Sequence, residues 1–158
     1  MRELSIDKAV SYESYGFTYK NFCILSKQEL LTILEWRNHP SIRKLMTDNN
    51  TISVESHLAY TESLKNRSDR YYWLVLYKQT PIGVMNISSI DHKDNSCEPG
   101  YYLSPMMLDS GIGLDFHYSY KNLIFNIFNF DIIRGYILKG NDIAYLMSLF
   151  FGAFATGI

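Results

Sequence analysis

The sequence predicts an α/β domain whose mixed sheet is mostly antiparallel and is flanked by helices. Two observations lead to this prediction. Two strand-like runs, 71–77 and 82–87, are separated by a short turn, which is typical of a β-hairpin. Farther along, a buried strand leads through a loop with Gly111 and Gly113 into a helix, and a further strand follows at 130–138. A strand, a crossover helix and a second strand form a parallel βαβ unit.

Length and composition limit the function classes. At 158 residues the chain is one domain, large enough to bury a core. Its net charge of −1 and pI near 6.4 argue against a nucleic-acid binder. No apolar run reaches the length of a membrane span, and the N-terminus, with Glu3 and Asp7, lacks the apolar segment of a signal peptide. We therefore expect a cytoplasmic protein with no nucleic-acid or membrane partner.

The chain divides into a short arm and one long domain. Residues 1–16 show no clear period and are interpreted as a flexible arm, so the domain spans 17–158. The elements expected within the domain are strands at 17–25, 71–77, 82–87, 96–105 and 130–138, helices at 26–39, 54–65, 113–127 and 141–151, and a short helical piece at 41–46.

Several helix boundaries are marked by local signals. Ser26 and Glu29 have the spacing of a capping box, and Pro40 ends the helix that they open. Ser53 is a good N-cap for the next helix. That helix is expected to bury a stripe formed by Val54, Leu58, Thr61 and Leu64.

The stretch around Gly111 and Gly113 is a candidate phosphate site. A glycine loop at a helix N-terminus offers backbone N–H groups and the positive end of the helix dipole, although most Gly-x-Gly pairs are ordinary turns. Pro99 cannot donate to a sheet ladder. We expect a bulge at Pro99-Gly100 that splays this strand from its parallel neighbour, with a simple kink as the alternative. The resulting slot would suit an amide-rich ligand such as the pantetheine arm of coenzyme A.

Three segments together resemble the GNAT N-acetyltransferase superfamily. They are Trp36-Arg37-Asn38-His39-Pro40, the stretch 96–102 with its glycine loop, and Asn141-Asp142-Ile143-Ala144 with Gly152 and Gly157. More narrowly, the chain is similar to the nucleotide-sugar N-acetyltransferases of bacterial pseudaminic-acid biosynthesis, a flagellin-sugar pathway. The resemblance implies a GNAT-like sheet with a central splayed parallel pair, here without the last strands of the family. It also implies acetyl-CoA as cosubstrate and no metal.

The resemblance assigns residues to the cosubstrate. Backbone groups for the pyrophosphate come from Asp109, Ser110, Gly111, Ile112, Gly113 and Leu114, and those for the pantetheine arm from Tyr101, Tyr102 and Leu103. Asn141 is expected to contact the cofactor arm and to cap its helix. Leu108 stands where relatives carry Gln or Arg, which removes one side chain from a grip made mainly by backbone N–H groups.

The resemblance also assigns proton transfer. Glu98 is the carboxylate that would take the amine proton, and its alternative role is to pair with a cation. Ser148 stands where relatives carry a Tyr proposed to protonate the departing thiolate. Tyr145, one turn earlier on roughly the same face, is the candidate to replace that acid.

For the acceptor, the resemblance implies a UDP-linked 4-amino-4,6-dideoxy sugar. Arg37 and His57 would contact the nucleotide or diphosphate, and the sugar and uracil pocket would be shaped by Met46, Tyr60 and Tyr102. Arg37 could instead serve as a cation near a helix C-terminus.

Two other functions remain open at this point. One is acetylation of a protein N-terminus or another small amine, and the other is a non-catalytic acyl-CoA-binding module. The cations Arg37, Arg43 and Lys44 near the expected pocket favour UDP over a basic peptide. A homodimer is also left open.

Overall fold

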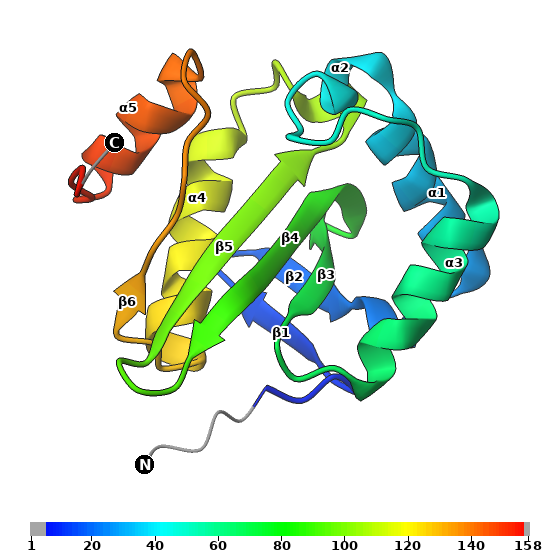
Figure 1. The fold of residues 1–158 in the computed structure, drawn as a ribbon, viewed down its shortest axis with the longest axis horizontal. Coiled ribbons are helices and arrows are strands. Elements are labelled where there is room, and N and C mark those ends of the chain that lie inside the picture. Colours follow the sequence, from blue (N-terminus) through cyan, green and yellow to red (C-terminus); the bar gives the residue numbers. More distant parts are fainter. Residues whose placement is uncertain (1–5, 157–158) are drawn as a thin grey trace.

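The computed structural model describes residues 6–156. They form a six-stranded sheet with the strands in chain order (Figure 1). The strands are β1 (Ser11–Ser14), β2 (Phe17–Asn21), β3 (Tyr71–Tyr77), β4 (Thr80–Asp91), β5 (Ser96–Leu103) and β6 (Ile132–Ile133). Neighbours from β1 to β5 are antiparallel, whereas β5 and β6 are parallel. The predicted mixed, mostly antiparallel α/β sheet is confirmed.

Helices cover both faces of this sheet. They are α1 (Lys27–Asn38), the short α2 (Pro40–Arg43), α3 (Val54–Ser63), α4 (Gly113–Asn122), a π-helical turn that continues α4 (Leu123–Ile127), and α5 (Asp142–Phe150). The larger apolar core lies between the sheet and α4 and includes Trp73 and Phe116. The smaller core lies on the opposite face, under α1 and α3, and includes Ile33 and Leu74 (Figure 1). Within residues 6–156, no helix is both long and apolar enough to span a membrane.

The N-terminal segment is more ordered than a flexible arm. Residues 11–14 form β1 and pair with β2 through a tight turn at Tyr15 and Gly16, both with positive φ. Ser14 is buried, and its Oγ donates to the carbonyl oxygen of Ser119 in α4 at 2.8 Å. The expected arm at 1–16 is therefore wrong from residue 11 onward, because strand pairing, the Ser14 hydrogen bond and the packing of Tyr12 on Phe128 hold this strand. Residues 1–5 lie outside the described part of the chain.

The predicted caps are confirmed, but one helix is rotated relative to the expectation. Ser26 and Glu29 form the capping box of α1, and Ser53 Oγ accepts from Ser56 N–H at the start of α3. Val54 is 44% exposed, whereas His57, Thr61 and Leu64 are the residues that α3 and the turn after it bury. A buried histidine thus takes the place that an apolar pattern assigns to Val54.

Candidate active site

The parallel strands β5 and β6 pair briefly and then separate. Pairing ends at Cys97, whose carbonyl oxygen accepts from Arg134 N–H at 2.9 Å. The chain then leaves the sheet, so β6 is far shorter than the strand predicted at 130–138. From the residue after Cys97 to Leu103, the outer edge of β5 faces no other strand among residues 6–156. The predicted splay is present, and it leaves backbone groups free for an extended ligand.

Pro99 lies at the start of this open edge, but the bulge predicted at Pro99-Gly100 is wrong. Pro99 stands opposite Ile87, and Gly100 opposite Asn86, in continuous register with β4. The irregularity lies on β4 instead, where Ser89 has a φ of 48°. A Cβ at Gly100 would lie 2.6 Å from Asn86 Oδ1, so a larger residue there would require the Asn86 side chain to shift. Since Pro99 has no N–H, it cannot continue the pairing with β6.

The glycine loop presents backbone N–H groups at the N-terminus of α4. Gly111 has a φ of 81°, and Ile112 at the N-cap makes no side-chain cap. The first-turn N–H groups of Gly113 and Leu114 therefore receive no side-chain acceptor. Free N–H groups at the positive end of a helix suit a pyrophosphate. Leu108 packs against the larger core.

The tyrosines of β5 point to opposite faces of the sheet. Tyr101 packs under α4, with its ring 5.2 Å from that of Phe116 and 5.3 Å from that of Tyr120. Tyr102 lies on the other face, in the smaller core under α1 and α3. Burial raises the pKa of both phenols. Both side chains thus point away from the slot between β5 and β6, which leaves the backbone of β5 for the cosubstrate. We call the face of the sheet that carries Tyr102 the acceptor face, because it is the candidate site for the amine substrate.

Glu98 shares this acceptor face, because side chains two and four residues apart in a strand point the same way. Its carboxylate is half-buried, and Oε2 accepts a hydrogen bond from Ser89 Oγ at 3.1 Å. None of the ion pairs in residues 6–156 involves Glu98. Within this part of the chain the Glu98 carboxylate is therefore not paired with a cation, and its role as the base stays a prediction.

Aromatic side chains and one arginine line the same face. Tyr60 and Tyr72 pack against the smaller core together with Tyr102 and Trp36. Arg37, at the end of α1, donates from Nη2 to the carbonyl oxygen of Asp48 at 2.8 Å, whereas its buried Nη1 has no partner. Its charge opposes the effect of burial on the pKa of Tyr102. Tyr60 and Tyr102 therefore pack against the same core, and their predicted contact with the acceptor, together with that of Arg37, stays a prediction.

His57 and Met46 do not join this group. His57 is 7% exposed, and its Nε2 lies 2.8 Å from the carbonyl oxygen of Leu30 in α1. Burial lowers the pKa of His57. In this structure the His57 ring joins α3 to α1, and its assignment to nucleotide contact stays a prediction. Met46 is half-buried in the loop after α2 and is absent from the cluster around Tyr102.

The residues predicted on α5 lie away from the slot. α5 lies outside α4, on the side opposite α1 and α3 (Figure 1), and none of its residues is buried. Asn141 Oδ1 accepts from Ala144 N–H at 3.2 Å, so the predicted cap is confirmed. Within residues 6–156 the structure gives no hydrogen bond from Asn141, Tyr145 or Ser148 to Glu98 or to the edge of β5, and β6 ends at Ile133 instead of continuing along the sheet. Their assigned roles stay predictions.

Sequence reasoning missed three side chains on the acceptor face. Tyr72 of β3 and Asn86 of β4 stand opposite each other, and Asn86 in turn stands opposite Gly100 of β5. Arg70 donates from Nη1 to Tyr60 Oη at 3.3 Å. The period-2 alternation of β3 separates Tyr72 from Tyr71, but only the register of the sheet shows that Tyr72 shares a face with Tyr102.

Comparison with known proteins places this geometry in a family. Residues 25–144 match the acetyltransferase (GNAT) domain family. Acetyltransferase PseH of Campylobacter jejuni is 35% identical over 122 residues, which cover 77% of this chain and 74% of PseH. The crystal structure of C. jejuni PseH in complex with acetyl coenzyme A has a TM-score of 0.67 at 26% identity and covers 84% of each chain. The chain therefore belongs to the GNAT acetyltransferase family.

A more distant structure shares the fold alone. Spermidine N-acetyltransferase from Vibrio cholerae, solved with CoA and spermine, has a TM-score of 0.78 at 17% identity, covering 90% of this chain and 83% of that one. The similarity to PseH confirms the resemblance to the pseudaminic-acid pathway enzymes that the sequence predicted. The chain is an acetyl-CoA-dependent N-acetyltransferase.

Proposed function

We propose that the acceptor is the amino group of a UDP-linked 4-amino-4,6-dideoxy sugar, to which the acetyl group is transferred directly. The observation that carries this proposal is Arg37, whose buried Nη1 has no hydrogen-bond partner among the described residues and whose charge opposes the rise that burial causes in the pKa of Tyr102. An unpaired guanidinium N–H in such a place has a strong preference for an anionic oxygen. The similarity to PseH over three quarters of the chain supports the same substrate class.

The cosubstrate would lie along the open edge of β5. The N–H groups of residues 109–114 at the start of α4 would hold the pyrophosphate, and backbone groups of residues 101–103 would pair with the pantetheine amides. Acetyl-CoA supplies the acetyl group as a thioester when bound. The role of this protein would be to hold the acetyl group beside the acceptor face.

Glu98 would prepare the amine for attack. An ammonium has no free electron pair, so a proton must leave nitrogen before the N–C bond forms. The Glu98 carboxylate takes that proton, directly or through one water, and Ser89 Oγ orients the carboxylate through the 3.1 Å hydrogen bond to Oε2. Tyr145 and Ser148 would have to move from the outer side of α4 to return a proton to sulfur.

Thiol release from acetyl-CoA tests this proposal against the alternatives. Release should depend on the UDP-4-amino sugar and not on spermidine or a peptide N-terminus, and UDP should compete. Arg37→Met should weaken UDP binding about tenfold, as expected for one charge-assisted hydrogen bond. Lys27→Met is the matched control, since Lys27 is an exposed cation at the opposite end of α1 from Arg37. Binding of acetyl-CoA without release over the whole panel would instead indicate an acyl-CoA-binding module.

A further inference from the structure

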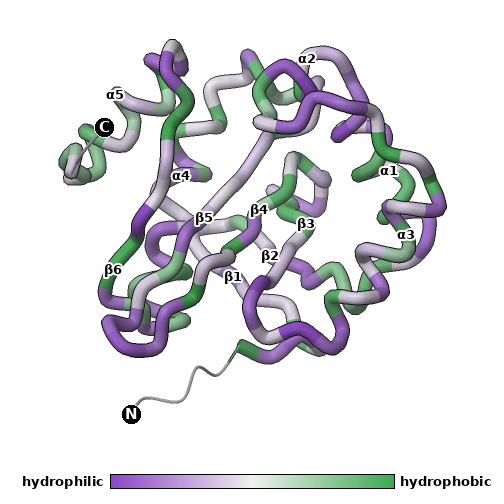
Figure 2. Tube along the Cα trace, viewed as in Figure 1, coloured by the Kyte–Doolittle hydropathy of each residue, from purple (hydrophilic) through white to green (hydrophobic). Residues whose placement is uncertain are grey.

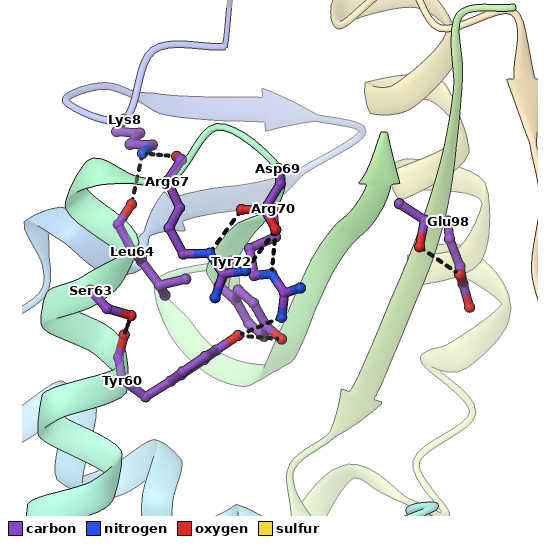
Figure 3. A network of polar contacts seen from close by, with 10 residues as sticks. Lys8, Tyr60, Ser63, Leu64, Arg67, Asp69, Arg70, Tyr72 and Glu98 are labelled. Atoms are coloured by element: carbon purple, nitrogen blue, oxygen red, sulfur yellow. Dashed lines mark hydrogen bonds and ion pairs between the residues drawn. The ribbon is translucent and has the colours of Figure 1, made fainter. Parts of the chain in front are cut away.

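A chain of hydrogen bonds runs from a cation to the acceptor face (Figure 3). Arg70, just before β3, donates from Nη1 to Tyr60 Oη of α3 at 3.3 Å, and Tyr60 Oη is 3.1 Å from Tyr72 Oη of β3. Arg70 is itself held by Asp69, whose Oδ2 accepts from Arg70 Nε at 3.2 Å. Asp69 is fixed in turn by two hydrogen bonds from Arg67, at 2.8 and 2.6 Å. The cation at the start of the chain is therefore anchored.

The chemistry of the three groups fixes the direction of the chain. A guanidinium can only donate, so the oxygen of Tyr60 accepts from Arg70. Tyr60 then gives its single hydrogen to the oxygen of Tyr72. The hydroxyl hydrogen of Tyr72 has no acceptor among the described residues. The chain thus ends in one free O–H donor, and a neighbouring cation strengthens donation along it.

The packing of Tyr72 holds this donor in place on the acceptor face. Its ring lies 5.8 Å from that of Tyr60 at 90° and 5.4 Å from that of Phe22 at 40°. Tyr72 belongs to the same apolar cluster as Tyr102, and both phenols lie on the side of the sheet that carries Glu98. The preceding residue, Tyr71, points into the opposite core, with its ring stacked on Trp73.

The spacing of the strands relates this donor to the reacting amine. Tyr72 stands opposite Asn86, and Asn86 stands opposite Gly100, two residues from Glu98. Adjacent strands are about 4.8 Å apart, so β3 and β5 are about 10 Å apart. A substrate whose amine lies at Glu98 and whose body extends over β4 would therefore bring its remaining polar atoms to Tyr72. Such an atom must be a hydrogen-bond acceptor, which in a sugar is an oxygen.

We propose that Tyr72 donates a hydrogen bond to an oxygen atom of the amine substrate, and that Arg70, acting through Tyr60, is a positioning residue for that donor. This inference rests on the proposed function and adds a specificity rule to it. A sugar carries hydroxyl, carbonyl and ring oxygens that can accept from Tyr72. A protonated polyamine offers only donors and would meet Arg37 and Arg70 as like charges. The site therefore selects oxygen-rich amines.

Steady-state kinetics on single variants tests this role. Tyr72→Phe keeps the ring and removes the donor, so the KM for the UDP-4-amino sugar should rise about tenfold, with kcat and the KM for acetyl-CoA changed less than twofold. Tyr71→Phe is the matched control, since it removes a phenol oxygen from the opposite face, and it should leave all three constants unchanged. An unchanged KM in Tyr72→Phe overturns the proposal.

A double-variant cycle tests the relay. Arg70→Met should raise the acceptor KM about threefold in the native background and have no effect when Tyr72→Phe is present, because its effect passes through that hydroxyl. Arg70→Lys retains a donor and should restore part of the loss. Equal effects of Arg70→Met in both backgrounds, or a matching fall in melting temperature with a raised KM for acetyl-CoA, would show that Arg70 is only structural.

The choice of acceptor separates this inference from the proposed function. If the UDP-4-amino sugar is not acetylated but another oxygen-bearing amine is, the proposed substrate is wrong, and Tyr72→Phe is compared on that amine instead. If spermidine is turned over with a KM that Tyr72→Phe does not change, the proposed selection is wrong. If no amine of the panel is acetylated, both proposals are overturned.

Discussion

β5 and α5 both carry residues that the sequence assigns to catalysis, but only β5 is held in place by packing. β5 pairs with β4 from Ser96 to Leu103, and its side chains contribute to the cores on both faces of the sheet. α5 buries no residue, although it is apolar (Figure 2), and Ile143 and Phe150 are 79% and 73% exposed. A role assigned on β5 thus rests on geometry as well as on a motif, whereas a role on α5 rests on the motif.

The largest difference between the two regions is expected in turnover. Glu98→Gln removes the group that accepts the amine proton and should lower kcat about 10²- to 10⁴-fold, with little change in acetyl-CoA affinity. Tyr145→Phe and Ser148→Ala should lower kcat by less than about threefold, because α5 lies outside α4 (Figure 1) and buries none of its residues. Thiol release at saturating acetyl-CoA measures all three variants.

The opposite order of kcat losses would contradict the assignment of catalysis to β5 rather than to α5. A kcat loss in Tyr145→Phe or Ser148→Ala comparable to that in Glu98→Gln would show that α5 reaches the slot during turnover. An unchanged kcat in Glu98→Gln would end its assignment as the base. Asp115→Asn, in the exposed first turn of α4, serves as the control for loss of one carboxylate.

The second difference is expected in stability. Phe116 is fully buried and contacts the rings of Phe17 and Tyr101, so Phe116→Ala should lower the free energy of unfolding by about 3–5 kcal/mol. Phe150→Ala, the same substitution on α5, should change it by less than about 0.5 kcal/mol. Urea denaturation followed by tryptophan fluorescence, which reports the buried Trp73, measures both variants. A loss above about 1 kcal/mol in Phe150→Ala would show that α5 is packed against more of the fold.

Sequence reasoning was accurate where a local signal determines the structure. The caps at Ser26 and Ser53, the hairpin and the splayed parallel pair depend on residue types at fixed spacing, and all are confirmed. β1 was missed because Ser-Tyr-Glu-Ser has no apolar pattern, and buried polar contacts such as that of Ser14 with α4 become visible only in the fold.

The candidate site was only partly predictable for the same reason. The open edge of β5 and the loop at Gly111 follow from Pro99 and from glycine spacing, which are local features. The burial of His57 against α1 and the chain from Arg70 to Tyr72 depend on how α3 crosses the sheet. No spacing in the sequence encodes that crossing, so these features could be identified only from the structure.

The C-terminal segment is attached to α4 through Phe151. Phe151, directly after α5, stacks on the His117 ring at 4.8 Å and 19°, and it also lies near Tyr118. His117 is 3% exposed, and Tyr120 Oη lies 2.8 Å from its Nε2. Burial, with a smaller contribution from the charge of Lys121, lowers the pKa of His117 to about 4. Part of this burial comes from a segment that is otherwise exposed.

Titration of His117 therefore measures how firmly this segment is attached. An unfolded chain binds a proton at a pKa of about 6.5, above that of the folded state, so between pH 6.5 and 4 the unfolded state holds more protons and stability falls as the pH falls. Phe151→Ala should expose the His117 ring and raise the pKa of His117 by about one unit. The pH range over which stability falls then becomes narrower. Imidazole resonances followed by NMR report the value, with Phe154→Ala as the exposed control. An unchanged pKa would mean that α4 and Tyr101 alone bury His117, and that the C-terminal segment contributes nothing to its environment.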